Sequence, residues 1–373
     1  MHLSVKEAAL RLREAIREAT RNLVDRDQLA ELMVLGAVAQ EHLLIVGPPG
    51  TGKSAVVRRV ADSLGGTYFE YLLGRFTEPS ELFGPVNLNK LRAGLVETDT
   101  GGMLPEADIA FLDEVFLGST AILNTLLGLL NERQFRRGHT RIRCPLRICV
   151  GAANGLPEDD NLAAFADRFL LHAFVEPVAD HRLEELLAAG WKAGHPTVAA
   201  HADLACLDVL NAAVDEVDMD VVRPALAHAV RQLRQAGMAL SDRRIVRAQR
   251  LIAASAVLAG RSQASPSDLW PLLFAIPHQA GQASAREVLR DVFAQASHPL
   301  LQSVTEHTAQ TPEARIGRLV DDADRLLLGA NGKPAREHVE ALLRQIDANF
   351  DPARLPAELS ERRSKLIGSI HWA

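Results

Sequence analysis

The most informative stretch of this sequence is Gly47-Pro48-Pro49-Gly50-Thr51-Gly52-Lys53-Ser54. It matches the phosphate-binding pattern G-x-x-x-x-G-K-[ST] at every fixed position. That pattern needs a strand before it and a helix after it. Residues 42–46 form a short apolar run that predicts a buried strand, and residues 55–61 carry apolar side chains at helical spacing. A glycine-rich turn with a chance lysine is the alternative, and the flanking elements argue against it.

Each residue type in this loop suits the binding of a phosphate chain. The glycines allow a tight turn whose N–H groups face phosphate oxygens, and the helix that follows adds its own free N–H groups. Lys53 would bring a positive charge to the β- and γ-phosphates, and Ser54 would offer its hydroxyl to Mg²⁺. We therefore assign nucleotide binding to Gly47, Pro48, Pro49, Gly50, Thr51, Gly52, Lys53, Ser54 and Ala55.

The composition indicates a soluble globular protein. The chain has 373 residues, 47% of them hydrophobic and 24% charged, which predicts two or three domains. Its net charge of −6 argues against a chain built as a whole to bind nucleic acid. Three cysteines at positions 144, 149 and 206 fit no zinc-binding spacing, and no signal segment or membrane-length apolar run is visible. We expect a cytoplasmic protein with buried thiols.

The order of predicted elements indicates a parallel α/β sheet followed by helices. Strands are predicted at 42–46, 67–72, 107–112 and 146–153, and helices at 3–22, 27–40 and 119–132. Strands that alternate with helices favour a parallel sheet covered on both faces. Residues 84–102 are interpreted as an insert that leaves the sheet, and Gly138 centres a predicted hairpin. Later helices are predicted at 180–190, 203–217, 220–236, 242–260, 314–328 and 334–347.

An acidic pair follows the third predicted strand. Asp113 and Glu114 come directly after the apolar residues 109–112, about 60 residues beyond the phosphate loop. The carboxyl ends of parallel strands lie at one edge of a sheet, which is where ligands bind. Asp113 would hold Mg²⁺ through its water shell, and Glu114 would orient and polarise the attacking water. An exposed pair of acids at a strand end is the structural alternative.

A polar amide follows the fourth predicted strand. Asn154 comes directly after the apolar run at 148–153. At the same sheet edge, its amide would point between the γ-phosphate and the two carboxylates and position the water without changing its charge. An asparagine that stabilises the turn before Gly155 is the alternative.

Three motifs in this order resemble those of AAA+ ATPases: GPPGTGKS at 47–54, FLDE at 111–114 and GAAN at 151–154. Further stretches narrow the resemblance to the MoxR branch and, within it, to the RavA-like group; they are 69–77, 81–85, 104–107, 121–127 and 131–135. The resemblance covers roughly residues 5 to 260. It implies an α/β nucleotide-binding domain, a helical lid, and the hydrolysis of ATP with Mg²⁺.

The resemblance also implies further site residues. Residues 84–102 correspond to a helix-two insert and residues 135–147 to a pre-sensor hairpin. Leu23 and Val24 lie where such proteins pack adenine. Arg168, within Asp167-Arg168-Phe169, resembles an arginine finger that acts on the neighbouring subunit, and Arg243 resembles a sensor-two residue. An arginine supplied by a neighbour can raise the rate ~10³-fold, and a site that needs it is incomplete in a single chain, so we expect a ring. The resemblance implies that this ring is a homo-oligomer of six subunits.

Several arginine assignments have alternatives. Arg168 could instead form a local ion pair with Asp167, and Arg244 or Arg247 could replace Arg243, since both lie within about one helical turn of it. The basic residues of the hairpin could bind acidic surfaces or nucleic acid; they are Arg136, Arg137, Arg141, Arg143 and Arg147. Phe135 is the one aromatic residue among them, so a solvated hairpin or a partner contact is favoured over base stacking.

The sequence thus predicts three regions: an α/β domain at 1–178, a helical lid at 179–280 and a helical extension at 281–373. The resemblance implies a chaperone-like ATPase that remodels or activates a protein partner with a von Willebrand factor A (vWA) domain. The β-rich insertion of longer RavA-type proteins is not predicted, so recognition that depends on it is not carried over. A dedicated activator of the Rubisco-activase or metal-chelatase type, and a nucleotide-operated switch with low turnover, remain open. A DNA helicase fits less well, because the chain is acidic.

Overall fold

The computed structural model describes residues 3–192, 202–309 and 355–370, with short parts of 319–346. The chain forms two compact units, one of residues 1–177 with 195–308 and one of 178–194 with 309–373. Each unit is described by itself. The limits predicted for the α/β domain, the lid and the extension stay predictions.

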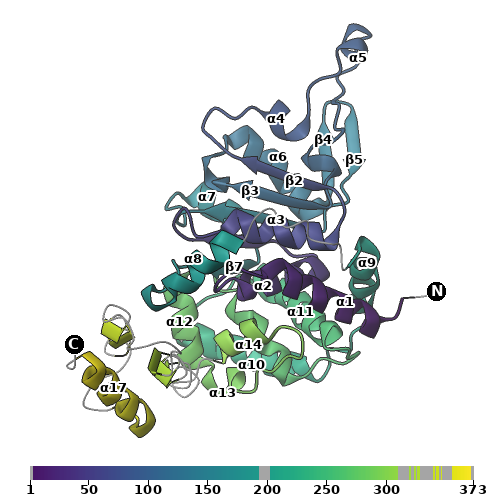
Figure 1. Cartoon of the computed structure of the whole chain (residues 1–373). Coiled ribbons are helices and arrows are strands. Elements are labelled where there is room, and N and C mark those ends of the chain that lie inside the picture. The colour runs from purple at the N-terminus through teal and green to yellow at the C-terminus, as the bar shows by residue number, and fades with distance from the viewer. Residues whose placement is uncertain are drawn as a thin grey trace. The chain divides into compact units, whose positions relative to one another are not determined.

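The larger unit is built on a five-stranded parallel sheet in the order β2-β3-β6-β1-β7 (Figure 1). Its strands are β1 (Leu43–Val46), β2 (Tyr68–Leu72), β3 (Ile109–Asp113), β6 (Ile148–Ala153) and β7 (Leu171–Phe174). The predicted α/β class is confirmed, and four of the strands lie where the apolar runs predicted them. The fifth, β7, was not predicted, although residues 169–174 include apolar side chains that are buried in the sheet.

Helices cover both faces of the sheet because the strand residues alternate between two cores. Leu43 and Ile45 face one core, and Leu44 and Val46 face the other. The first core contains α1 (Val5–Thr20), α2 (Asp27–Ala39) and α3 (Lys53–Leu64); the second contains α4 (Pro79–Phe83) and α6 (Thr120–Glu132). The buried residues of α6 are Ile122, Leu123, Leu126, Leu129 and Leu130, and Leu127 is partly buried.

The predicted insert and hairpin lie together. The insert contains the short helix α5 (Leu88–Arg92), and the hairpin pairs β4 (Gln134–Arg137) with β5 (Thr140–Arg143). Val96 contacts the hairpin turn, where the His139 amide donates to the Val96 carbonyl over 2.8 Å. Figure 1 shows α5 at the end of a segment that extends away from the sheet, and its Leu88 side chain is exposed.

The helices after residue 202 contribute buried side chains to the first core. They are α9 (Leu204–Asp215), α10 (Val222–Gln235), α11 (Asp242–Leu258), α12 (Gln279–Val288), α13 (Arg290–Phe293) and α14 (Gln302–Thr308). Short elements complete this unit: α7 (Asp160–Ala166) and the 3₁₀ segments η1 (Leu104–Glu106), η2 (Val115–Leu117) and η4 (Pro266–Leu273). The predicted helical region is therefore confirmed from 203 to 258.

The smaller unit contains η3 (Asp180–Arg182), α8 (Leu183–Lys192) and α17 (Ala357–Ile370). Leu359 and Leu366 of α17 pack with Leu319 and Leu342 in a small apolar cluster. The predicted helices at 314–328 and 334–347 fall mostly outside the described residues. None of the helices that the structure describes is long and apolar enough to cross a membrane.

Candidate active site

The predicted phosphate-binding and acidic residues meet at the carboxyl edge of the sheet. The strands that precede them are neighbours in the order β3-β6-β1. Asp113 ends β3, Asn154 follows β6, and Gly47 follows β1. The Gly47 amide donates to the carbonyl of Ala153 over 3.1 Å, so the start of the loop lies beside Asn154. Adjacent strands are only about 4.8 Å apart, which brings three distant sequence motifs into one site.

The phosphate loop has the backbone that its glycines permit. Gly50 and Gly52 adopt φ of 78° and 77°, a region that favours glycine, and α3 begins at Lys53. The Lys53 ammonium group donates to the carbonyls of Gly47 over 2.6 Å and Pro48 over 2.9 Å. Burial lowers the pKa of Lys53, and the Asp113 and Glu114 carboxylates oppose that shift. Lys53 therefore lies within electrostatic reach of both acids.

Gly47 is required for a different reason. A Cβ atom at this position would lie 2.2 Å from the carbonyl oxygen of Val175, immediately after β7. The Val175 amide in turn donates to the carbonyl of Val46 over 2.8 Å. The base of the loop is thus packed against the end of β7 with no room for a side chain.

Glu114 is held in an unusual backbone conformation and by a neighbouring amide. Its φ and ψ are 49° and 46°, in the left-handed region. Its amide donates to the Asp113 carboxylate over 3.0 Å, and its own carboxylate accepts a hydrogen bond from the Asn154 side chain. The two acids and the amide predicted from three separate motifs therefore form one connected group.

The donor set fits a magnesium ion. Ser54 is the second residue of α3, and Asp113 ends β3, which β6 separates from β1. A hydroxyl and a carboxylate therefore flank the phosphate loop. Magnesium keeps several waters and needs few protein ligands. Within the described ranges, no group of three or more His, Cys, Asp and Glu side chains could enclose a metal. The residues present suit a cation bound jointly with phosphate oxygens.

The turn between α1 and α2 lies next to the loop. It contains Leu23, which is partly buried, and Val24, which is 6% exposed. The next residues include Arg26, whose guanidinium donates from Nε to the carbonyl of Thr51 over 2.8 Å. Arg26 was not predicted as a site residue. No sequence motif identifies Arg26, because the residue that it contacts in the loop is 25 positions away in the sequence.

Arg168 and Arg243 lie at the opposite edge of the sheet. Arg168 precedes β7, and a four-residue strand spans roughly 13 Å, so the loop and Arg168 are at different ends of the strands. Arg243 donates to the side chain of Asn131, at the end of α6. Burial lowers the pKa of Arg243 most, and the nearby Arg168 and Arg247 lower it further. The structure brings the two arginines together, but not to the loop of the same chain.

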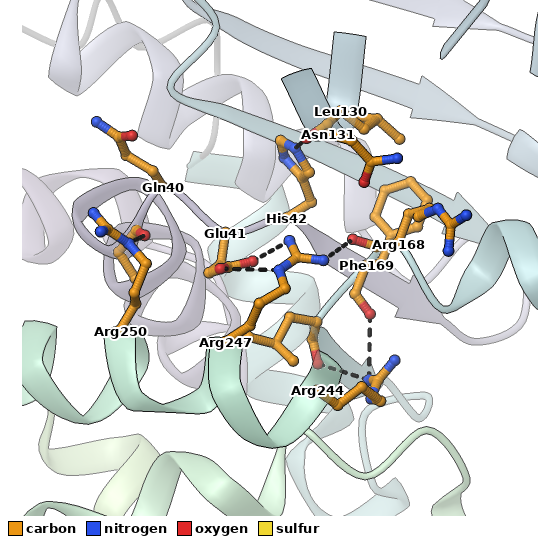
Figure 2. Close-up of polar contacts among 12 residues, drawn as sticks. Gln40, Glu41, His42, Leu130, Asn131, Arg168, Phe169, Arg244, Arg247 and Arg250 are labelled. Atoms are coloured by element: carbon orange, nitrogen blue, oxygen red, sulfur yellow. Dashed lines mark hydrogen bonds and ion pairs between the residues drawn. The ribbon is translucent and has the colours of Figure 1, made fainter. Parts of the chain in front are cut away.

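Neighbouring arginines on α11 have structural partners (Figure 2). Arg244 is 3% exposed and forms an ion pair with Asp167 at 2.8 Å. Arg247 pairs with the buried Glu41 and donates to the carbonyl of Arg168 over 3.3 Å. Asp167 is thus paired with Arg244, and the suggested local ion pair between Asp167 and Arg168 is not the one observed. The buried Nε of Arg168 has no hydrogen-bond partner in the described part of the chain.

Two family descriptions match the chain. A sequence model described as the MoxR domain in the MoxR-vWA-beta-propeller ternary systems matches residues 10–216, which is more than half of the chain. A second, described as an AAA lid domain, matches residues 219–287.

Individual proteins are also similar. Two proteins of Methanocaldococcus jannaschii without an assigned function are each 34% identical over 259 residues, which cover 69% of this chain and 69% and 67% of theirs. Chaperone MoxR1 of Mycobacterium tuberculosis is 29% identical over 163 residues, or 43% of this chain and 42% of MoxR1. The crystal structure of a candidate ATPase from Cytophaga hutchinsonii aligns with a TM-score of 0.61 at 17% identity, over 78% of this chain and 97% of that one. This last likeness concerns the fold.

Proposed function

Because the chain belongs to the MoxR family of AAA+ ATPases, we propose that it hydrolyses ATP at the carboxyl edge of its sheet. The observation that carries this proposal is the meeting of Lys53, Glu114 and Asn154 at that edge. A cationic side chain, a carboxylate and a neutral amide beside a phosphate-binding loop are the groups that phosphoryl transfer to water requires.

Lys53 would bind the β- and γ-phosphates. Its ammonium group now donates to the carbonyls of Gly47 and Pro48, so phosphate oxygens would replace those acceptors. Leu23 and Val24 would pack against the adenine ring. Ser54 and Asp113 would hold Mg²⁺, which neutralises charge on the phosphate oxygens when it is bound.

Glu114 would orient the attacking water and accept its proton. In the structure its carboxylate is bound by the Asn154 amide, and the αL backbone directs the residue away from a regular continuation of β3. Asn154 would exchange this contact for one with the γ-phosphate when nucleotide binds. The same pair of residues then both restrains and releases the general base.

Arg168 and Arg243 would act on the nucleotide of a neighbouring subunit. They lie at the edge opposite their own loop, and the positive charge that Arg168 and Arg243 concentrate there suits phosphate oxygens supplied by another chain. We therefore propose a homo-oligomeric ring, with six subunits as in the RavA-like group. The active site is incomplete in a single chain.

The hydrolysis of ATP would serve to remodel or activate a protein partner. The family description names vWA systems, and MoxR1 is named a chaperone, which supports a vWA-domain partner and a chaperone-like role. The exposed Leu88 and Leu91 on α5 are available for such contacts. Three free, buried cysteines suit the reducing cytoplasm, where we place the protein.

A second candidate is a nucleotide-operated switch with low turnover. The hydrogen bond between Asn154 and Glu114 favours it, because a base held by an amide is not positioned on water. The two candidates share the nucleotide site and differ in whether the assembled protein completes many turnovers.

The test is to measure steady-state ATP hydrolysis and equilibrium nucleotide binding on the same samples. Glu114→Gln should lower turnover at least about 100-fold while binding persists, since a general base contributes that much or more. Lys53→Ala should abolish binding, and Glu158→Gln, at an exposed acid, should change neither. A wild-type chain that binds nucleotide without turnover would support the switch, and one that binds none would reject both candidates.

A further inference from the structure

We propose that Arg26 is a positioning residue of the nucleotide site: it fixes the shape of the phosphate loop from behind and adds a positive charge that favours triphosphate over diphosphate. This inference rests on the proposed function. It adds a residue that lies outside the sequence motifs and that the chemistry described above does not use.

The Arg26 guanidinium connects three segments of the chain. Nε donates to the carbonyl of Thr51 over 2.8 Å, Nη1 to that of Asp25 over 2.8 Å, and Nη2 to that of Glu176 over 3.1 Å. Thr51 lies between Gly50 and Gly52, the two loop residues with positive φ. A flexible glycine-rich turn thus has its central carbonyl fixed by a rigid planar donor.

The same contact links the loop to the helical part. Glu176 follows β7, and its side chain accepts a hydrogen bond from Gln279, the first residue of α12, over 3.1 Å. Arg26 therefore stands between the phosphate loop and the segment at which the sheet meets α12. No shorter side chain offers donors to Thr51 and Glu176 at once.

The charge of Arg26 is not neutralised by its hydrogen bonds. Its three acceptors are carbonyl oxygens, and the residue is 7% exposed. Burial lowers its pKa more than the nearby Asp25 carboxylate raises it. Such a cation is costly to bury, and its field extends through the backbone of the loop toward bound phosphates.

A buried cation behind the loop acts most strongly on the most highly charged ligand. One unit charge about 10 Å away, at an effective dielectric near 20, changes the affinity for one additional ligand charge roughly tenfold. If Arg26 had a mainly structural role, its replacement would weaken the binding of all nucleotides equally. The ratio of the dissociation constants for ADP and for a non-hydrolysable ATP analogue therefore separates the two roles. This ratio does not depend on the fraction of protein that is folded.

The experiment compares full-length wild type, Arg26→Gln, Arg26→Lys and Arg59→Gln by titration with ADP and AMP-PNP in the presence of Mg²⁺. Arg59 is the matched control, since it also donates to a backbone carbonyl, that of Arg21 over 2.7 Å, and lies on α3 without contacting the loop. We expect Arg26→Gln to reduce the preference for AMP-PNP roughly tenfold. Arg26→Lys should weaken the binding of both ligands but keep the preference for AMP-PNP within about threefold of wild type. Lysine keeps the positive charge and lacks the planar guanidinium with its paired donors.

The inference is overturned if Arg26→Gln keeps the wild-type preference for AMP-PNP over ADP. It is also overturned if Arg59→Gln reduces that preference as much as Arg26→Gln does. Either result would leave the proposed ATPase intact, because the wild type would still bind nucleotide and hydrolyse it. A wild-type chain that binds neither ligand would overturn the inference together with the proposed function.

Discussion

The side-chain amide of Asn154 donates a hydrogen bond to the carboxylate of Glu114. The two residues follow β6 and β3, which are adjacent parallel strands, so they meet at the edge where the phosphate loop also lies. The amide nitrogen carries two N–H donors, and we expect a bound γ-phosphate to compete with the carboxylate for them. With Glu114 as the proposed general base, this pair would link the presence of triphosphate to the release of that base.

Asn154→Ala should reduce ATP turnover about 10- to 100-fold and leave the nucleotide dissociation constant within about threefold of wild type, because the amide orients the reacting groups and does not anchor the phosphates. Steady-state hydrolysis and equilibrium binding measure the two effects. Asn161→Ala, in the first turn of α7, is the control. Unchanged turnover in Asn154→Ala would show that Glu114 needs no amide partner.

Gly47→Ala should destabilise the fold by about 3 kcal/mol, since the new methyl group would overlap the Val175 carbonyl and force the loop and the end of β7 apart. Gly155→Ala is the matched control, because a Cβ there meets no atom within 4 Å; its effect should stay within about 0.5 kcal/mol. Urea unfolding monitored by circular dichroism compares the two variants. Equal stability of Gly47→Ala and wild type would contradict the packing described here.

Glu31 should make stability depend on pH. It is 5% exposed on α2, and its carboxylate accepts hydrogen bonds from the amides of Ser303 over 3.2 Å and Val304 over 2.8 Å. Burial raises its pKa to about 7, against the two hydrogen bonds. The folded state then binds the proton more tightly than the unfolded state, so this contribution to stability is full below the unfolded pKa and is lost as pH rises toward 7.

The free energy of unfolding of wild type, relative to that of Glu31→Gln, should therefore fall by about 3 kcal/mol between pH 4.5 and 7 and stay level above that range. Denaturant unfolding of both proteins at a series of pH values gives this difference and removes the contributions of all other groups. A difference that is constant between pH 5 and 7 would mean that Glu31 is ionised throughout.

Much of the sheet and of the phosphate site could be predicted from the sequence because their signals are local. Asp113 and Asn154 each follow an apolar run directly, and a parallel sheet places such strand ends together. The loop contains its own glycines at the positions where positive φ is needed. These inferences require only the order of the strands and the rule that ligands bind at their carboxyl ends.

The rest depends on contacts between distant segments. The strand β7 is only four residues long and follows a short helix, so its apolar run does not stand out. Arg26 contacts Thr51 and Glu176, and Arg244 pairs with Asp167, which is 77 residues away in the sequence. One basic stretch on α11 contains the buried structural Arg244 and the partly buried sensor candidate Arg243, and no periodicity distinguishes them. Only its hydrogen bonds to Asp167 and to the carbonyls of Phe169 and Leu170 assign Arg244 to the core.

The central claim is that each active site is completed by a neighbouring chain, and mixing two inactive variants tests it most directly. Arg168→Ala keeps Glu114, and Glu114→Gln keeps Arg168, so an interface between the two contains one intact copy of each residue. We expect each variant alone to lose about 10²-fold or more of its ATP turnover, and an equal, randomly assembled mixture to recover about a quarter of the wild-type rate. A mixture no more active than the average of its two components would contradict the account.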